Sequence, residues 1–230
     1  VGVGDTGISV HPAFMDPTFN DKVIATKPDS DSDWEDDDGH GTHVAGTILG
    51  TGAGHPSGST RYKGMAPKAK LVSQNYLDNQ NEFYYIPFSK IFEEAYSYGA
   101  RIHNNSWGPI SYLDPNGNEH LAFELDGIYN NNSADIDNFC WSRKDMAIVF
   151  SAGNERDGDW VYFNNIPLYY ATNPDPMGPS IGDKAAAKNN VVVGAVENNK
   201  PLDPLKPKFP DRMASFSSIG PTHDGRIKPD

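Results

Sequence analysis

Short apolar runs alternate with segments of helical periodicity along much of the chain. The apolar runs end in small or polar residues and predict strands at 1–4, 70–77, 146–152 and 191–196. Residues 88–95 instead carry apolar side chains at i, i+3, i+4 and i+7, which predicts a helix that Gly99 ends. A less regular helical pattern follows at 121–128.

Strands that alternate with helices predict an α/β fold, a mostly parallel twisted sheet flanked by helices. The uninterrupted apolar residues 146–150 favour a strand covered on both faces. The chain of 230 residues fits one domain spanning 1–230. Two stretches without a clear period, 29–38 and 160–179, are interpreted as surface excursions, and the proline-rich 200–210 as a connecting loop.

Composition narrows the classes of function. The formal net charge of −12 would repel phosphate backbones and anionic lipid surfaces, so no nucleic-acid partner is expected. Cys140 is the only cysteine, which excludes an intrachain disulfide, a zinc finger and a thiol-redox pair. No apolar run is long enough for a membrane span, and no signal peptide opens the chain. Because it begins inside an apolar strand, we expect a fragment.

Polar residues directly after the predicted strands are the candidates for chemistry. Asp5 follows the first strand, His40 opens a small-residue helix, and Asn154 ends a later strand segment. An Asp that orients a His, a His that carries a proton and an amide that binds an oxyanion are parts of an acyl-transfer site. Each residue alone could equally be a cap or turn residue, so the combination carries the hypothesis.

Several segments in order resemble the signatures of the subtilisin-like serine proteases, the subtilases. They are DTGI at 5–8, GHGTHVAGT at 39–47, NNSWG at 104–108, SAGNE at 151–155 and the closing segment 213–230. The resemblance implies the family's three-layer fold and an endopeptidase acting on polypeptide substrates. It places the triad Asp at Asp5, the triad His at His40 rather than His43, and the oxyanion Asn at Asn154.

The nucleophile of that family is missing from the sequence. No GTSMA-like turn and no G-x-S-x-G elbow is present, and the serines at 106, 151, 217 and 218 correspond to other positions of the family pattern. We therefore expect the attacking Ser to lie downstream of Asp230, and this chain alone to be inactive and incomplete at the C-terminus. The alternative is a pseudoprotease that binds peptides without cleaving them.

The resemblance also implies where a peptide would bind. Ser106, Trp107 and Gly108 would form a strand edge for the substrate, and Gly153, Asn154 and Glu155 would line the pocket for the residue before the scissile bond. Trp107 could equally be a core residue. By resemblance we further expect a secreted or cell-envelope protein, with a propeptide and a C-terminal β-sandwich domain in the parent chain and no organic cofactor.

The acidic run before His40 leaves its role open. Asp29, Asp31 and Asp33 are candidate Ca²⁺ ligands, because carboxylates suit this hard cation and subtilases often use it. The EF-hand pattern fails, since Trp34 occupies the position of its glycine. A solvated acidic loop and a subsite for basic side chains are the alternatives. A zinc site at His40 and His43 is disfavoured because the HExxH arrangement is absent.

Overall fold

The structure is a computed structural model of the 230-residue chain. The described residues are 1–9, 23–26, 35–52, 63–76, 86–108, 112–113, 119–120, 127–156, 160–163, 166–169, 179–197 and 212–230. They divide into two compact units, each built from two stretches of chain. Unit 1 contains Val1–Ser106 and Asn138–Ile148, and unit 2 contains Trp107–Asp137 and Val149–Asp230.

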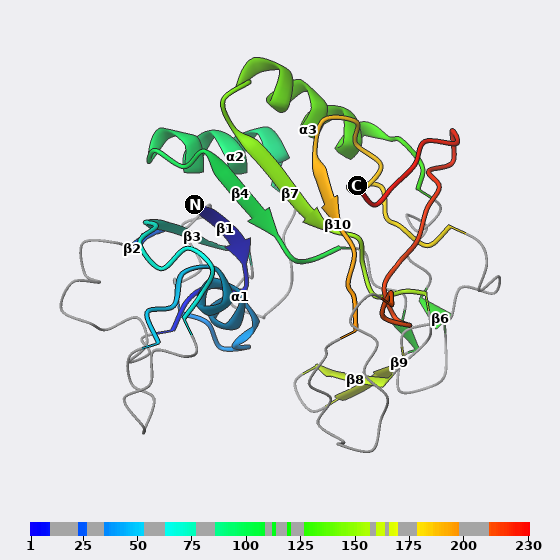
Figure 1. Ribbon diagram of the computed structural model, residues 1–230, viewed down its shortest axis with the longest axis horizontal. Coiled ribbons are helices and arrows are strands. Elements are labelled where there is room, and N and C mark those ends of the chain that lie inside the picture. The colour runs from blue at the N-terminus through cyan, green and yellow to red at the C-terminus, as the bar shows by residue number, and fades with distance from the viewer. Residues whose placement is uncertain are drawn as a thin grey trace. The chain divides into compact units, whose positions relative to one another are not determined.

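The sheet of unit 1 is parallel, as the sequence predicts. Its strands are β1 (Gly2–Asp5), β2 (Val23–Thr26), β3 (Leu71–Asn75) and β4 (Ile102–Asn105). They lie in the order β4-β1-β3-β2 (Figure 1), and every pair is parallel. Parallel strands end at the same edge of a sheet, so Asp5 at the end of β1 faces the side where α/β proteins place their working groups.

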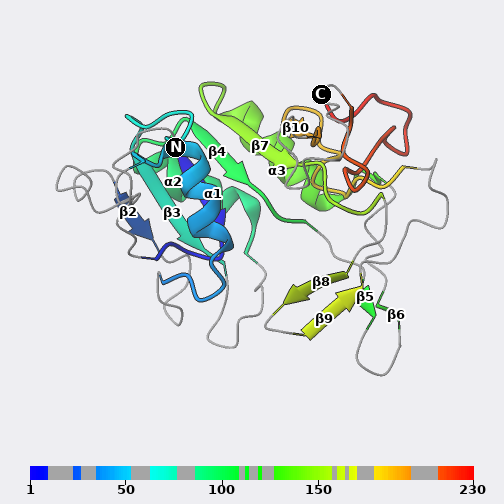
Figure 2. The same cartoon turned by 60° about the horizontal axis from the view of Figure 1, so that its bottom comes forward.

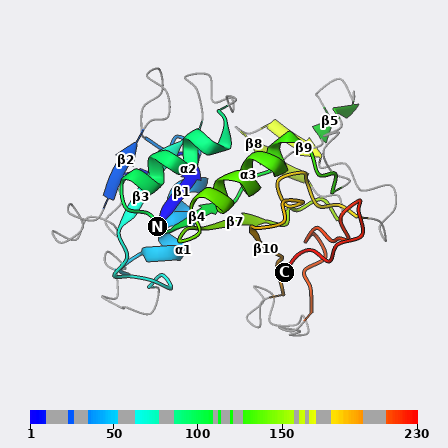
Figure 3. The same ribbon diagram turned by 90° about the horizontal axis from the view of Figure 1, so that it is seen from above.

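Helices cover both faces of this sheet. Helix α1 (His40–Leu49) lies on one side of β1 and β3, and α2 (Phe88–Ser97) lies on the other (Figure 3). The α2 helix buries the apolar positions that predict it and ends before Gly99. Helix α1 turns its small and apolar positions, Gly41, Ala45 and Leu49, toward the interior. The predicted α/β layering is therefore confirmed.

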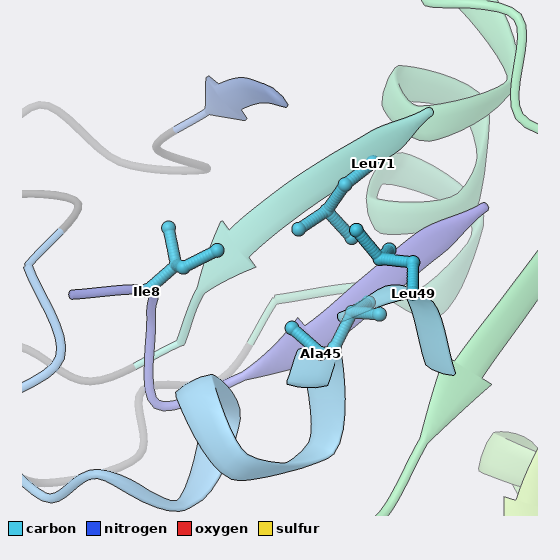
Figure 4. Close-up of a cluster of buried hydrophobic side chains, with 5 residues drawn as sticks. Ile8, Ala45, Leu49 and Leu71 are labelled. Atoms are coloured by element: carbon cyan, nitrogen blue, oxygen red, sulfur yellow. The ribbon is translucent and has the colours of Figure 1, made fainter. Parts of the chain in front are cut away.

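Apolar side chains from β1, β3 and α1 form the core beneath the candidate site. Val3, Leu71, Ala45 and Leu49 are almost fully buried, together with Ile8 from the segment after β1 (Figure 4). Burial of this kind stabilises a fold by roughly 25 cal/mol per Å² of apolar surface. The cluster fixes α1 against β1, the two elements that carry His40 and Asp5.

Unit 2 combines one parallel pair with two hairpins. Strand β10 (Val191–Val193) pairs in parallel with β7 (Ala147–Ser151). The antiparallel pairs are β5 (Tyr112–Leu113) with β6 (Glu119–His120), and β8 (Trp160–Phe163) with β9 (Ile166–Tyr169), which Figure 2 shows side by side. Helix α3 (Asn131–Ser142) begins in this unit. Ala152, Ile181, Ala185 and Val192 form its small core.

Several predictions about local structure need correction. In β7, Ala147 is exposed and Val149 only half-buried, so the strand is not covered on both faces. The segment 160–179 contains the β8–β9 hairpin. Ile128 is not helical; the helix begins at Asn131 instead, and 121–126 lies outside the described residues. The loop predicted at 200–210 also lies outside the described residues.

Candidate active site

Asp5 closes β1 and is almost fully buried, with 2% of its surface exposed. One carboxylate oxygen, Oδ1, accepts a hydrogen bond from the backbone N–H of Thr6 at 2.9 Å. The same oxygen lies 2.7 Å from Nδ1 of His40. A buried carboxylate held in this way can orient an imidazole and stabilise its protonated form.

His40 is the first residue of α1, and its side chain is 48% exposed. Because a carboxylate oxygen accepts, Nδ1 carries the hydrogen of the Asp5 contact, which leaves Nε2 as the basic nitrogen of the neutral ring. Within the described residues no group is hydrogen-bonded to Nε2. The hydrogen bond to Asp5 raises the pKa of His40; burial opposes this rise, while the charges of Asp5, Asp38 and Asp36 add to it.

The close approach of α1 to β1 requires a residue without a side chain at Gly41. A Cβ there would overlap the carbonyl oxygen of Gly7 and lie 3.2 Å from Cβ of Asp5. The backbone N–H of Gly41 donates to Oγ1 of Thr6 at 2.9 Å. The glycine that follows His40 therefore brings the helix start close enough for the imidazole to reach Asp5. His43 is exposed on the same helix, away from this contact.

Asn154 lies in unit 2, directly after the turn at Gly153, and is exposed. Gly153 has φ 108°, a conformation that L side chains rarely adopt, and a Cβ there would meet the carboxylate of Glu155. The turn therefore folds the backbone tightly against Glu155 and leaves the Asn154 amide at the surface. An exposed amide donor can reach a substrate oxyanion, which is the role that we predict for it.

A pocket in unit 2 gathers most of the residues predicted to bind substrate. It measures about 260 Å³ with its open mouth included, and its lining contains Trp107, Gly108, Gly153 and Glu155. Trp107 also packs edge-on against buried Phe150, with ring centroids 6.0 Å apart, so it has both a pocket face and a core contact. Ser106 belongs to unit 1, where its Oγ accepts from the side-chain amide of Asn104 at 2.9 Å.

Glu155 is buried, and its carboxylate is held by Ser218. The Ser218 hydroxyl donates to Oε2 at 2.7 Å, and the backbone N–H of Glu155 donates to the same hydroxyl oxygen at 3.0 Å. Burial raises the pKa of Glu155, and the hydrogen bond from Ser218 offsets part of that rise. The pocket therefore carries an acidic group whose charge is costly to maintain.

The serines near the C-terminal end of unit 2 are buried and make hydrogen bonds within the protein. Ser217 and Ser218 are both fully buried. The Ser217 hydroxyl accepts from the backbone N–H of Ala195 at 2.9 Å, while Ser218 holds Glu155. A buried hydroxyl engaged in this way is unsuited to attack a bound peptide.

Sequence reasoning missed other residues of these sites. Asp36 lies beside the start of α1, where its carboxylate accepts from the Thr6 hydroxyl and the Thr42 N–H; nothing in the acidic composition of this stretch indicates that role. Lys184 lines the unit 2 pocket and pairs with the fully buried Asp183, with Nζ 2.9 Å from Oδ1. No motif pointed to this pair.

The structure offers no described ligand set for a metal. The candidate Ca²⁺ ligands Asp29, Asp31 and Asp33 lie outside the described residues. Among the residues that the structure describes, no group of three or more His, Cys, Asp or Glu could hold a metal ion. In the same described part of the chain, no helix is long and apolar enough to cross a membrane.

Comparison with known proteins shows the family. The model of the Subtilase family, Peptidase_S8, matches residues 1–230. "Serine protease AprX" of Bacillus subtilis is 27% identical over 100% of this chain and 44% of its own length. "Serine protease/ABC transporter B family protein tagD" of Dictyostelium discoideum is 24% identical over 100% of this chain and 15% of its own length. The chain thus spans less than half of either relative.

Solved structures agree on the fold. The psychrophilic subtilisin-like protease Apa1 from Pseudoalteromonas sp. AS-11 has a TM-score of 0.59 at 17% identity, with 95% of this chain and 38% of that chain covered. The epidermin leader peptide processing serine protease EpiP from Staphylococcus aureus has a TM-score of 0.55 at 17% identity, with 95% and 48% covered. These likenesses show the fold alone, and the match of the family model over residues 1–230 shows that the chain belongs to the Subtilase family.

Proposed function

We propose that this chain is the Asp- and His-bearing part of a serine endopeptidase whose attacking Ser lies outside residues 1–230. The observation that carries the proposal is the 2.7 Å contact between buried Asp5 and the Nδ1 atom of His40, which leaves Nε2 open. Membership of the Subtilase family and the similarity to proteins named as serine proteases support the same chemistry.

In the proposed reaction, Nε2 of His40 accepts the proton of the Ser hydroxyl while Oγ bonds to the peptide carbonyl carbon. Asp5 stabilises the imidazolium that forms, and the side-chain amide of Asn154 donates to the oxyanion. The C–N bond then breaks, and the leaving amine takes the proton from Nε2. A water molecule repeats the two steps on the acyl-enzyme, which releases the new carboxyl end and restores the Ser.

We propose that the substrate is a polypeptide held in an extended conformation. The backbone of Ser106, Trp107 and Gly108 would pair with it, and the unit 2 pocket would take the side chain before the scissile bond. The open pocket lined by Trp107 and Glu155 supports this assignment. By family resemblance, we also propose that the parent protein is secreted or attached to the cell envelope. It would carry a propeptide, structural Ca²⁺ and a C-terminal β-sandwich domain.

Fluorophosphonate labelling tests the proposal. The probe forms a covalent bond only with an activated Ser, and mass spectrometry locates the label. We expect the full-length gene product to be labelled at a Ser outside residues 1–230 and the 230-residue chain to stay unlabelled. His40→Ala should abolish labelling, and Asp5→Asn should slow it by about 10⁴-fold, the loss in turnover that this change causes in another protease with the same triad.

The matched control is His43→Ala, which removes an exposed imidazole from the same helix without touching Asp5. Labelling of Ser217 or Ser218 would show that the nucleophile has been misassigned. A folded full-length protein without any label would reject catalysis, and peptide binding by a pseudoprotease would then explain the pocket.

A further inference from the structure

Among the described acids at 35–38, Asp36 alone is buried. It is 6% exposed, whereas Asp37 and Asp38 are exposed. A buried charge is costly unless hydrogen bonds replace the lost water. Three donors do so: the Thr6 hydroxyl at 2.7 Å and the Gly39 N–H at 2.8 Å reach Oδ1, and the Thr42 N–H reaches Oδ2 at 2.7 Å.

These donors come from both sides of the Asp5–His40 pair. Gly39 precedes His40, Thr42 follows it by two residues, and Thr6 follows Asp5. Thr6 also accepts from the N–H of Gly41 at 2.9 Å, so its hydroxyl bridges Asp36 to the helix start. One connected set of hydrogen bonds therefore joins the end of β1 to the first turn of α1.

The first turn of α1 needs such an external partner. Its N-cap residue, Gly39, has no side chain with which to bond the free N–H groups of the helix start. The Asp36 carboxylate supplies the missing acceptor, and its negative charge suits the positive end of the helix dipole. Burial raises the pKa of Asp36, but the hydrogen bonds from Thr42, Thr6 and Gly39 together outweigh burial and lower it, so the carboxylate stays charged near neutral pH.

We propose that Asp36 and Thr6 form a clamp that sets the position of His40 relative to Asp5, which makes both of them positioning residues for the proton-transfer step. The inference rests on the proposed function only in taking His40 as the base. Neither residue needs to touch substrate. The clamp acts by holding the backbone on both sides of the imidazole, so that Nδ1 stays within hydrogen-bonding distance of Asp5.

The first test compares Thr6→Val with Thr6→Ser in the full-length protein. Valine has the shape of threonine without its hydroxyl, so it removes both clamp bonds of residue 6, whereas serine keeps them. We expect Thr6→Val to lower kcat on a peptide substrate by about 10- to 100-fold, the cost of a misplaced catalytic group, with KM nearly unchanged. Thr6→Ser should restore kcat to within about threefold of the parent.

A titration of His40 gives a readout that loss of stability alone would not move. Because the hydrogen bond from His40 to Asp5 raises the His40 pKa, a displaced imidazole should titrate at lower pH. We expect NMR of the His40 ring to show a lower pKa in Thr6→Val and the parent value in Thr6→Ser. The charged groups that face this ring are Asp5, Asp36 and Asp38.

The second test separates position from charge. Asp36→Asn and Asp37→Asn each remove one negative charge, but only the first places an amide donor against the donors of the clamp. Because the Asp36 charge by itself raises the His40 pKa, kcat is the quantity that this pair of variants compares. We expect Asp36→Asn to lower kcat and Asp37→Asn to leave it unchanged. Parent values of kcat in folded Thr6→Val and Asp36→Asn, with the parent His40 pKa in Thr6→Val, would overturn the clamp.

The two proposals can fail separately. If the parent protein cleaves no peptide, the serine-protease assignment fails, yet the His40 titration still decides whether Thr6 and Asp36 position the ring. If the parent protein cleaves peptides and the variants titrate and turn over like it, only the clamp fails.

Discussion

Acid should weaken this fold through one buried histidine, His103 on β4. Its side chain is fully buried, and its Nε2 lies 2.8 Å from the amide oxygen of Gln74, to which it donates. Its ring packs edge-on against Phe92 with centroids 5.0 Å apart. Burial lowers the pKa of His103 from 6.5 to about 3, against a smaller raising effect of hydrogen bonding with Asn105.

The size of the effect follows from that difference. Below pH 6.5 the unfolded chain binds a proton that the folded chain refuses until about pH 3, so stability is complete above pH 6.5 and is lost as the pH falls. A pH of 5 lies 1.5 units below 6.5, the pKa of this histidine in the unfolded chain. At about 1.4 kcal/mol per unit, His103 should cost the fold roughly 2 kcal/mol between pH 7 and pH 5.

Urea unfolding at pH 7 and pH 5 measures this cost in the parent and in His103→Gln. Glutamine keeps an N–H donor for Gln74 but does not titrate, so the variant should lose about 2 kcal/mol less on acidification. His40, whose folded pKa is raised, contributes with the opposite sign but is present in both proteins. The matched control is His43→Gln, which removes an exposed ring. An equal acid-induced loss in the parent and in His103→Gln would refute the reasoning.

Three other substitutions test contacts within the two units. Gly41→Ala should push α1 away from Gly7 and cost about 1–3 kcal/mol in urea unfolding, with a lower His40 pKa by NMR. Asp137→Asn should cost about 1–3 kcal/mol and speed amide exchange in the 188–189 segment, because this carboxylate accepts from both amides. Glu155→Gln should raise the melting temperature more at pH 7 than at pH 4, since the raised pKa of Glu155 makes its charged form costly.

The sequence predicts those strands and helices whose buried side chains are apolar. Strands β1, β3, β7 and β10 and helix α2 follow from their hydrophobic spacing. Strand β4 escapes prediction because its buried positions are His103 and Asn105, which are polar. Helix α3 escapes for a similar reason, since its buried positions include Ser133 and Asp137, both held by hydrogen bonds. Polar residues satisfied by distant partners leave no periodic signal.

The candidate site divides in the same way. Its motif residues Asp5, His40 and Asn154 can be named from the sequence because each follows a recognisable strand or opens a helix. The partners that hold them cannot, since Thr6 and Asp36 are 30 residues apart and bond only after β1 and α1 have come together. The acidic composition of 35–38 hides the difference between Asp36, which is buried, and its exposed neighbours.

The carboxylates around His40 also affect the basicity of its ring. The same carboxylates that orient the ring or lie near it also favour its protonated form, because Asp5, Asp38 and Asp36 all raise the His40 pKa. A general base must be unprotonated before the reaction and must hold a proton during it. The buried contact with Asp5 serves the second need directly, because it acts on the hydrogen at Nδ1. The exposed charge of Asp38 acts through solvent and is screened by salt. The protein therefore sets the basicity of the His40 ring mainly through the geometry of the Asp5 contact, which is the contact that the proposed clamp of Asp36 and Thr6 would hold.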